Sequence, residues 1–382
     1  MQAGEDYVRE EKLHGRNLKE MEACCMKRIG MLTSGGDCQA LNATMRGIVK
    51  GVCNALDEVE LYGFEEGYKG LIYGNYRMLT PRDFSGILTK GGTILGSSRQ
   101  PFKMMRVPDE NGLDKVEAMK QTYHKLRLDC LVILGGNGTQ KTANLLREEG
   151  LNILHMPKTI DNDIWGTDMT FGFQSAVDIA TQAIDCIHTT AASHGRVFIV
   201  EVMGHKVGQL TLHAGIAGGA DIILIPEIPY SIDSICKAIE ARNKQKKGFT
   251  ILAVAEGAIP KERAEMGKKE LKKFMETYQY PTVSYEIAAQ LTERLGTEVR
   301  VTVPGHTQRG GSPCPYDRVL STRLGAAAAQ AIVDDAYGYM IGIVNNECVR
   351  IPLEESAGKL KFIDPNSSII SEAKMIGISF GD

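Results

Sequence analysis

The chain has 382 residues, of which 43% are hydrophobic and 24% charged, so length and composition favour a globular protein with two domains around two cores. Its formal net charge of −3 argues against a general nucleic-acid-binding protein. The apolar stretches are interrupted by Gly, Asp or Lys, and none reaches the roughly 18–20 residues that a membrane-spanning helix needs, so no membrane contact is expected.

The first 27 residues are rich in Glu, Lys and Arg and lack the apolar segment of a secretory signal. The cysteines are odd in number and, apart from the adjacent Cys24 and Cys25, are scattered without C-x-x-C spacing. A zinc site or a disulfide framework is therefore not expected. Reduced thiols in a cytoplasmic protein are the simpler interpretation.

From Arg28 onward, short apolar runs alternate with helical patterns. We predict strands over residues 29–33, 131–134, 197–202 and 250–255, and helices over 41–52, 139–149 and 210–217. Buried strands that alternate with helices indicate parallel α/β sheets. In such sheets ligands bind beyond the carboxyl ends of the strands, which is where the glycine-rich turns of this chain fall.

Two glycine-rich turns, at Gly35-Gly36 and at residues 135–139, each join a predicted strand to a predicted helix. Glycine lets backbone N–H groups approach phosphate oxygens, and a helix N-terminus favours negative charge. Taken alone, either turn is equally compatible with a tight turn that binds nothing. No G-x-x-x-x-G-K-[ST] sequence occurs, which excludes a P-loop kinase.

The segment PKTIDND, residues 157–163, follows another apolar stretch and carries two carboxylates, Asp161 and Asp163. One carboxylate could accept the proton of an attacking hydroxyl while the other supports a metal ion or orients its partner. From composition alone, a polar turn that caps a helix is the favoured alternative.

Further cationic and polar residues fall at the ends of predicted elements. Arg and His suit a sugar phosphate, and Glu suits sugar hydroxyls, although each alone is more often a surface ion pair. Phosphoryl transfer needs phosphate cradles, a base, cations and a second anion site together. The residues in question are Arg196, Met203, Gly204, His205, Glu256, Arg300 and the run 305–309.

Eight sequence runs resemble, in this order, motifs of the 6-phosphofructokinase family: LTSGGD, NATMRG, GGTILGSSR, ILGGNGTQ, PKTIDNDIWGTD, SHGRVFIVEVMG, AGGADIILIPE and GHTQRGGSPCPYDR. The match runs from about Arg28 to Leu324 without a large gap. The combination of TIDND with GHxQRGGSPxxYDR is highly specific.

The resemblance implies a fold of two Rossmann-like three-layer α/β domains with mainly parallel sheets and chain crossovers between them. We expect an N-terminal extension (1–27), a nucleotide-binding domain (28–172 plus about 308–355), a sugar-phosphate-binding domain (173–307) and a C-terminal segment (356–382). It also implies an allosteric glycolytic kinase that is a cytoplasmic homotetramer or homodimer.

The implied reaction moves the γ-phosphoryl group of ATP, with Mg²⁺ as cofactor, to the 1-hydroxyl of fructose 6-phosphate. Asp161 would be the general base, and Asn137 and Asp163 would support the metal. The implied ATP-phosphate site is Gly36, Arg99, Gln100, Gly136, Asn137, Gly138 and Thr139. The implied sugar-phosphate site is Thr159, Ile160, Asp161, Arg196, Met203, Gly204, His205, Glu256, Arg300, His306, Thr307, Gln308 and Arg309, with Arg196 and Arg300 reaching a neighbouring subunit.

Three departures from the family pattern leave alternatives open. Asn137 stands where the family usually has an Asp that helps to hold Mg²⁺, and His205 stands where Arg is usual. Lys158 is typical of pyrophosphate-dependent members, whereas Gly138 is typical of ATP-dependent ones, so both positions bear on donor specificity. The alternatives are a pyrophosphate-dependent phosphofructokinase and a catalytically weak regulatory paralogue.

Overall fold

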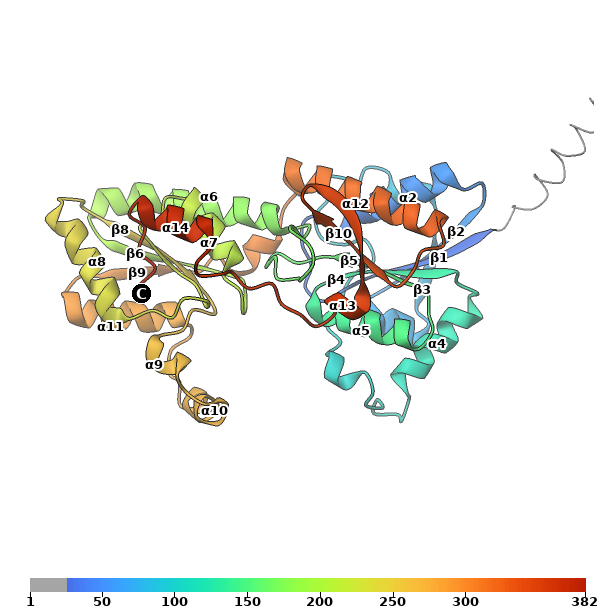
Figure 1. Ribbon diagram of the computed structural model, residues 1–382, viewed down its shortest axis with the longest axis horizontal. Coiled ribbons are helices and arrows are strands. Elements are labelled where there is room, and N and C mark those ends of the chain that lie inside the picture. Colours follow the sequence, from blue (N-terminus) through green and yellow to red (C-terminus); the bar gives the residue numbers. More distant parts are fainter. Residues whose placement is uncertain (1–25) are drawn as a thin grey trace, which may run out of the picture.

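Two β-sheets organise the chain, as Figure 1 shows for the computed structural model, which describes residues 26–382. The expected N-terminal extension, with Cys24 and Cys25, therefore lies almost wholly outside the described residues. The first sheet has the strand order β11-β10-β5-β4-β1-β2-β3 and the second has the order β7-β8-β6-β9. The predicted α/β fold with two mainly parallel sheets is confirmed.

The first sheet is parallel at its centre and ends on an antiparallel strand at each edge, β3 and β11. All six residues of β4 are buried, as expected where helices cover both faces of a parallel sheet. Helices α2 and α12 cover one face, and α3, α4 and α5 cover the other (Figure 1). Its strands are β1 (Lys27–Ser34), β2 (Val59–Phe64), β3 (Tyr76–Leu79), β4 (Cys130–Gly135), β5 (Ile153–Pro157), β10 (Tyr339–Val344) and β11 (Glu347–Pro352). Its helices are α2 (Leu41–Ala55), α3 (Tyr68–Tyr73), α4 (Lys115–Lys125), α5 (Asn137–Glu148), α12 (Pro315–Val333) and α13 (Leu353–Ser356).

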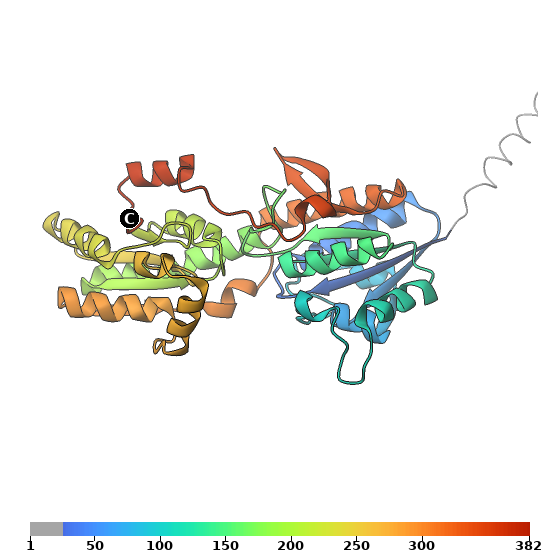
Figure 2. The ribbon, with the colours of Figure 1, turned by 60° about the horizontal axis from the view of Figure 1, so that its bottom comes forward.

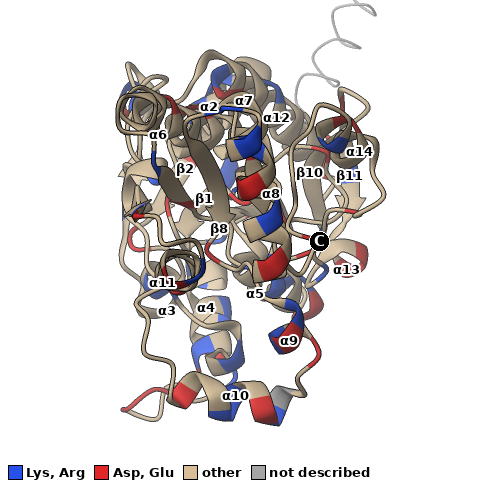
Figure 3. Ribbon diagram, turned by 90° about the vertical axis from the view of Figure 1, so that its left-hand side faces the viewer, with Lys and Arg blue, Asp and Glu red and all other residues tan. Residues whose placement is uncertain are grey.

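The second sheet is entirely parallel, and β6 and β8 are buried along their whole length. Helices α6 and α7 pack on one face and α8 and α11 on the other. Acidic and basic residues are interspersed along α8 and α10 (Figure 3), and Asp233, Lys237, Glu240 and Lys244 of α8 are exposed. The strands are β6 (Val197–Val202), β7 (Ile222–Leu224), β8 (Thr250–Ala255) and β9 (Val299–Thr302). The helices are α6 (Phe173–His194), α7 (Gln209–Ala217), α8 (Ile232–Lys244), α9 (Lys261–Ala264), α10 (Lys268–Glu276) and α11 (Val283–Leu295).

The chain passes between the two sheets more than once. It leaves the first sheet after β5, builds the second from β6 to β9, and returns through α12 to form β10 and β11. After α13 it crosses again to α14 (Ser368–Met375), as the red segment of Figure 2 shows. The expected crossovers are present, whereas the residue bounds that we assign to the two domains stay a prediction.

The C-terminal residues are packed against the second sheet. Ser379 pairs with Ile222 beside the edge strand β7, and Phe380 is fully buried. Within residues 26–382, none of the helices has the length and apolar character needed to span a membrane. None of the cysteines in this range forms a disulfide.

Candidate active site

A cavity of about 620 Å³ lies where the carboxyl ends of β1, β4 and β5 meet those of β6 and β8. An adjoining cavity of about 470 Å³ shares Gly36, Arg99, His306 and Arg309 with it. The larger cavity is lined by most of the predicted site residues, namely Gly36, Arg99, Gln100, Gly136, Asn137, Gly138, Thr139, Lys158, Thr159, Asp161, Asp163, Met203, His205, Glu256, His306 and Arg309.

The turn between β4 and α5 presents a helix N-terminus to the cavity. Helix α5 begins at Asn137 after Gly136, and no side chain caps its first turn. Its N–H groups can therefore bind an anion. Gly135 is required here because a Cβ atom would lie 2.3 Å from Thr139 Cγ2, whereas a Cβ atom at Gly138 would meet nothing within 4 Å.

Asn137 is held by a distant part of the chain. Its side-chain Nδ2 donates a hydrogen bond of 2.9 Å to the carbonyl oxygen of Lys359, which follows α13. The amide group is thus oriented by its nitrogen, and its Oδ1 remains available as a ligand. An Asp at this position could not donate to that carbonyl.

Asp161 sits on a loop that is closed by its own hydrogen bonds. The backbone N–H of Asp161 donates to Thr159 Oγ1 at 3.0 Å, and Thr170 N donates to Asn162 Oδ1 at 3.0 Å. Asn162 has φ of +51°, a left-handed conformation that Asn tolerates better than most residues. In the described part of the chain no group donates to the Asp161 carboxylate, so it is free to accept a proton from a ligand.

Asp163 and Lys158 both line the cavity, and burial disfavours the charged form of each. Burial, and then the negative charge of Asp161, raise the pKa of Asp163 to about 6. Lys158 is only 3% exposed, and burial lowers the pKa of its ammonium group. Among residues 26–382 it has no ion-pair partner within 4.0 Å. A buried ammonium group that faces a cavity suits an anionic ligand.

The opposite side of the cavity is built by the loops after β6 and β8. Glu256 Oε1 accepts a hydrogen bond of 2.8 Å from the backbone N–H of His205, whose φ is +51°. A Cβ atom at Gly257 would lie 2.0 Å from the carbonyl oxygen of His205, so only glycine allows this close approach. Gln308 is buried and accepts from Met203 N at 3.2 Å, so it holds the loop in place and does not line the cavity.

Arg309 is a cation without an acidic partner in the described structure. Its Nη1 donates to the carbonyl oxygen of Asp37 at 3.0 Å, and its buried Nε has no hydrogen-bond partner there. A Cβ atom at Gly36 would lie 2.8 Å from Nη1, so glycine at this position admits the guanidinium group. Arg309 is therefore placed to bind an anion in the cavity.

Several predicted residues lie elsewhere. Ile160 is fully buried in the core, and neither Gly204 nor Thr307 lines the cavity. Arg196 and Arg300 both pair with Glu298 near the amino end of β6. Seven residues of extended chain at about 3.3 Å each separate Arg196 from Met203, so these two arginines lie far from the cavity of their own chain.

Sequence reasoning missed a buried carboxylate that supports the site. Asp317, within the PYDR part of the last motif, accepts hydrogen bonds from Gly172 N at 3.1 Å and Ser175 N at 2.8 Å. It thereby caps the N-terminus of α6, the helix that follows the Asp161 loop. In the sequence, only its place in the motif GHTQRGGSPCPYDR indicated a role for Asp317. Its capping function could not be predicted, because the capped residues lie more than 140 positions away in the chain.

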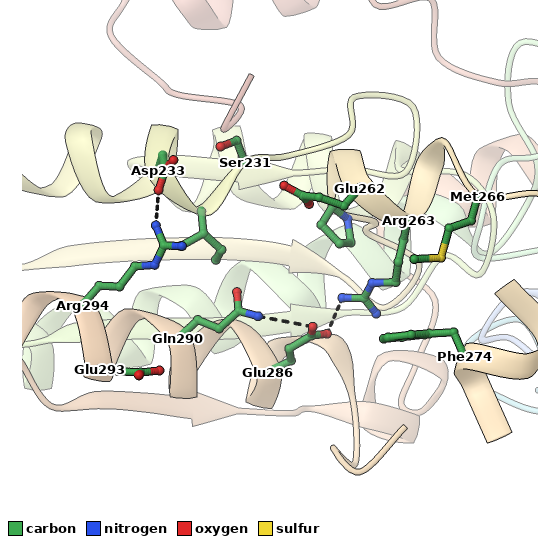
Figure 4. A pocket seen from close by; sticks show the side chains of 12 residues that line it. Ser231, Asp233, Glu262, Arg263, Met266, Phe274, Glu286, Gln290, Glu293 and Arg294 are labelled. Carbon is green, nitrogen blue, oxygen red and sulfur yellow. Dashed lines mark hydrogen bonds and ion pairs between the residues drawn. The ribbon is translucent and has the colours of Figure 1, made fainter. Parts of the chain in front are cut away.

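A further cavity, of about 420 Å³, lies beside α9, α10 and α11 (Figure 4). Its two arginines are already paired, Arg263 with Glu286 and Arg294 with Asp233. The aromatic rings of Phe274 and Tyr278 also lie within 5.4 Å of the Arg263 guanidinium carbon. Because its cations are neutralised locally, this cavity is a weaker candidate for anionic substrates than the one around Asp161.

In comparisons with known proteins, the matching family model and the similar proteins are all phosphofructokinases, although they differ in phosphoryl donor. Residues 28–332 match the family model described as Phosphofructokinase. An ATP-dependent 6-phosphofructokinase of Spirochaeta thermophila is 53% identical over 369 residues, which are 95% of this chain and 100% of that protein. A pyrophosphate–fructose 6-phosphate 1-phosphotransferase of Amycolatopsis methanolica is 43% identical over 339 residues, covering 88% of this chain and 96% of that protein.

Solved structures are similar as well. Phosphofructokinase of Pichia pastoris, crystallised in the T-state, matches with a TM-score of 0.74 and 33% identity over 88% of this chain. The chain spans 36% of the length of that larger polypeptide.

Proposed function

The chain belongs to the phosphofructokinase family, and on this basis we propose that the cavity around Asp161 transfers the γ-phosphoryl group of ATP to the 1-hydroxyl of fructose 6-phosphate. The activity is that of an ATP-dependent 6-phosphofructokinase, a glycolytic kinase whose product is fructose 1,6-bisphosphate. One observation carries the assignment of the site. A single cavity unites an uncapped helix N-terminus, the carboxylates of Asp161 and Asp163, and the cations Lys158 and Arg309, which have no acidic partner among residues 26–382. These are the parts that phosphoryl transfer requires.

In the proposed mechanism Asp161 is the general base. Its carboxylate faces the cavity and is not engaged by a donor in the described residues, so it can take the proton of the sugar 1-hydroxyl as that oxygen attacks. The hydrogen bond from Asp161 N to Thr159 Oγ1 fixes the loop and limits the positions that the carboxylate can adopt.

The donor phosphates are proposed to bind the turn between β4 and α5. The N–H groups at the start of α5 and the cations Lys158 and Arg309 would offset the charge that builds on the transferring group. Fructose 6-phosphate would lie on the opposite side, against Met203, His205 and Glu256. Glu256 is then the acceptor for sugar hydroxyls, and His205 and His306 are donors.

The residues present fit a magnesium ion carried in with the nucleotide. Mg²⁺ usually takes one or two protein oxygens and completes its shell with water and phosphate. Asp163 is a carboxylate whose burial a cation would offset, and Asn137 has an unengaged Oδ1. These two residues would hold the ion, which when bound offsets charge on the phosphates.

Replacing Asn137 by Asp tests this metal assignment. The added charge is expected to lower the Mg²⁺ concentration needed for half-maximal activity several-fold, while metal-free ATP binds more weakly. The substitution also removes the hydrogen bond to the carbonyl oxygen of Lys359, so a fall in thermal stability is expected. Magnesium titration in steady-state assays and calorimetry with and without metal measure these effects. An unchanged magnesium requirement would remove Asn137 from the metal site.

Arg196 and Arg300 support a proposal of an oligomer. Both lie at the amino end of the second sheet, far from the cavity of their own chain, Arg196 half-exposed and Arg300 exposed. Among residues 26–382 the acidic partner of each is Glu298. We propose that they complete the sugar-phosphate site of a neighbouring subunit in a homodimer or homotetramer. A monomeric mass in light scattering at assay concentration would contradict this proposal.

We also propose a cytoplasmic location for the protein. Fractionation of the source cells would test it.

The activity itself is tested with the purified chain, MgATP and fructose 6-phosphate. Formation of ADP should depend on the sugar phosphate, and ³¹P NMR should show a second phosphate ester on the sugar. Binding of both ligands without turnover would favour the regulatory alternative.

A further inference from the structure

The residues that follow α13 run past two loops that carry candidate active-site residues before they reach α14. We define residues 359–363 as the C-terminal strap. Within these five residues the strap contacts the turn at Asn137 and the Asp161 loop directly. In the part of the chain that the structure describes, it is linked to the loop after β6 only through the carboxylate of Glu227, which follows β7. No family motif identified in the sequence covers this segment.

The contact with the Asp161 loop is the most extensive. Lys361 Nζ donates to Asn162 Oδ1 at 3.1 Å, to the carbonyl oxygen of Thr167 at 2.8 Å and to that of Asp168 at 2.9 Å. An ammonium group has three donors, and all three are used on this one loop. Lys361 thus adds three hydrogen bonds to a loop that is also closed by its own, and it ties Asn162 near the start of the loop to Thr167 and Asp168 near its end.

The strap backbone holds the same loop from another side. Lys361 N donates to the carbonyl oxygen of Asp163 at 2.9 Å, and Leu360 forms an antiparallel bridge with Ile164. Lys359 Nζ lies 4.6 Å from the centroid of the Trp165 ring. The loop segment from Asp163 to Asp168 is thus fixed along its length by residues about 200 positions away in the chain.

The strap is also joined to the sugar side of the cavity. Ile363 N donates to Glu227 Oε1 at 3.1 Å, and the Glu227 carboxylate accepts from Gly208 N at 3.0 Å. Gly208 immediately precedes α7 and ends the loop that carries Met203 and His205. Beyond the strap, Phe380 is buried and Ile223 N donates to the carbonyl oxygen of Ser379 at 2.9 Å, so the far end is anchored on the second sheet.

From these contacts we propose that Lys361 is a positioning residue for phosphoryl transfer, which through the Asp161 loop sets the base against the sugar 1-hydroxyl. The inference rests on the proposed role of Asp161. Loss of the three Nζ hydrogen bonds would let the loop shift, and small displacements of a reacting group reduce the rate of the chemical step more than they weaken binding. Lys361→Met keeps an unbranched side chain only one atom shorter than lysine but removes all three donors.

The expected result for Lys361→Met is a fall in kcat of about 10- to 100-fold, with KM for ATP and fructose 6-phosphate changed by less than about threefold. Lys361→Arg, which keeps charge and donors, should recover part of the lost kcat. The matched control is Lys374→Met, because Lys374 lies on α14 of the same segment and its Nζ contacts Asp382 and the Phe380 ring, at 5.7 Å from the ring centroid. Among residues 26–382 no contact of this side chain reaches the Asp161 loop. The control should keep the wild-type kcat.

Trp165 provides a readout that a merely structural role would not move. It is the chain's one tryptophan, it lies within the loop, and it is 39% exposed. In folded Lys361→Met, well below its melting temperature, acrylamide quenching of Trp165 fluorescence should increase together with the loss of kcat. The control should show the quenching of the wild type. If Lys361→Met does not fold, Lys361→Gln, which has the same side-chain length as Met and keeps two N–H donors, is measured in its place and should show an intermediate kcat.

The proposal is overturned if folded Lys361→Met, or Lys361→Gln measured in its place, keeps kcat within about twofold of the wild type, or if it loses kcat with unchanged Trp165 quenching. It is also overturned if Lys374→Met loses as much activity as Lys361→Met, since the effect would then not belong to the loop contact. Absence of phosphofructokinase activity in the wild-type chain is a separate result, which would contradict the proposed function.

Discussion

Asp161→Asn is expected to lower kcat by about 10²- to 10⁴-fold while both KM values stay within a few-fold of the wild type. Asparagine keeps the shape of the side chain, and the hydrogen bond from residue 161 N to Thr159 Oγ1 does not involve the carboxylate, so the loop geometry should persist. What is lost is the group that accepts the proton of the sugar 1-hydroxyl. Steady-state assays at saturating ATP and fructose 6-phosphate measure the effect.

Asp168→Asn is the matched control for this variant. Asp168 lies on the same loop, and its Oδ2 accepts from Asn345 N at 2.7 Å, a bond that an amide oxygen can also accept. The control should keep kcat within about threefold of the wild type. If Asp161→Asn retains more than a tenth of wild-type kcat, Asp161 is not the base, and Asp163 becomes the candidate.

Gly138→Asp is expected to reduce kcat/KM for ATP by about 10²- to 10³-fold and to reduce that for pyrophosphate much less. A Cβ atom at this position meets nothing within 4 Å, so the fold should accept the side chain. The new carboxylate would stand beside the start of α5, where we propose that the nucleotide phosphates bind, and would repel the α-phosphate that ATP has and pyrophosphate lacks. With Lys158 already present, activity with pyrophosphate could rise.

Gly138→Asn separates charge from volume in this experiment. It has nearly the same size as the Asp variant but no charge, so it should lower the efficiency with ATP far less. Equal losses with both donors in Gly138→Asp, or equal losses with ATP in the Asp and Asn variants, would show that charge at this position does not select the donor.

Much of the fold could be predicted because its central strands are uniformly apolar. The strands over 197–202 and 250–255 match β6 and β8 in the structure, since every residue in them is buried. The edge strands β3 and β9 were not predicted, because all their residues except Leu79 are half-exposed or exposed and they carry no such run. Helix α5 begins at Asn137, two residues before the prediction, because Gly136 takes the cap position.

The site was predictable only in part. Motif resemblance indicated which residues gather at the cavity, but it could not distinguish side chains that line it from those that support it, such as Gln308 and Ile160. The contacts of the C-terminal strap could not be predicted from the sequence. Asn137 and Lys359 are 222 positions apart, and nothing in their local sequence indicates that they meet. The same bond gives a physical reason for an amide at position 137, where the family pattern has a carboxylate.

The comparison of ATP with pyrophosphate as donor, in one steady-state assay of the purified chain with Mg²⁺ and saturating fructose 6-phosphate, tests the central claim most directly. The open space at Gly138 predicts that kcat/KM for ATP exceeds that for pyrophosphate by at least about 10², which corresponds to about 2.7 kcal/mol in the transition state. A higher kcat/KM with pyrophosphate would contradict the claim and would make Lys158 the dominant determinant of the donor.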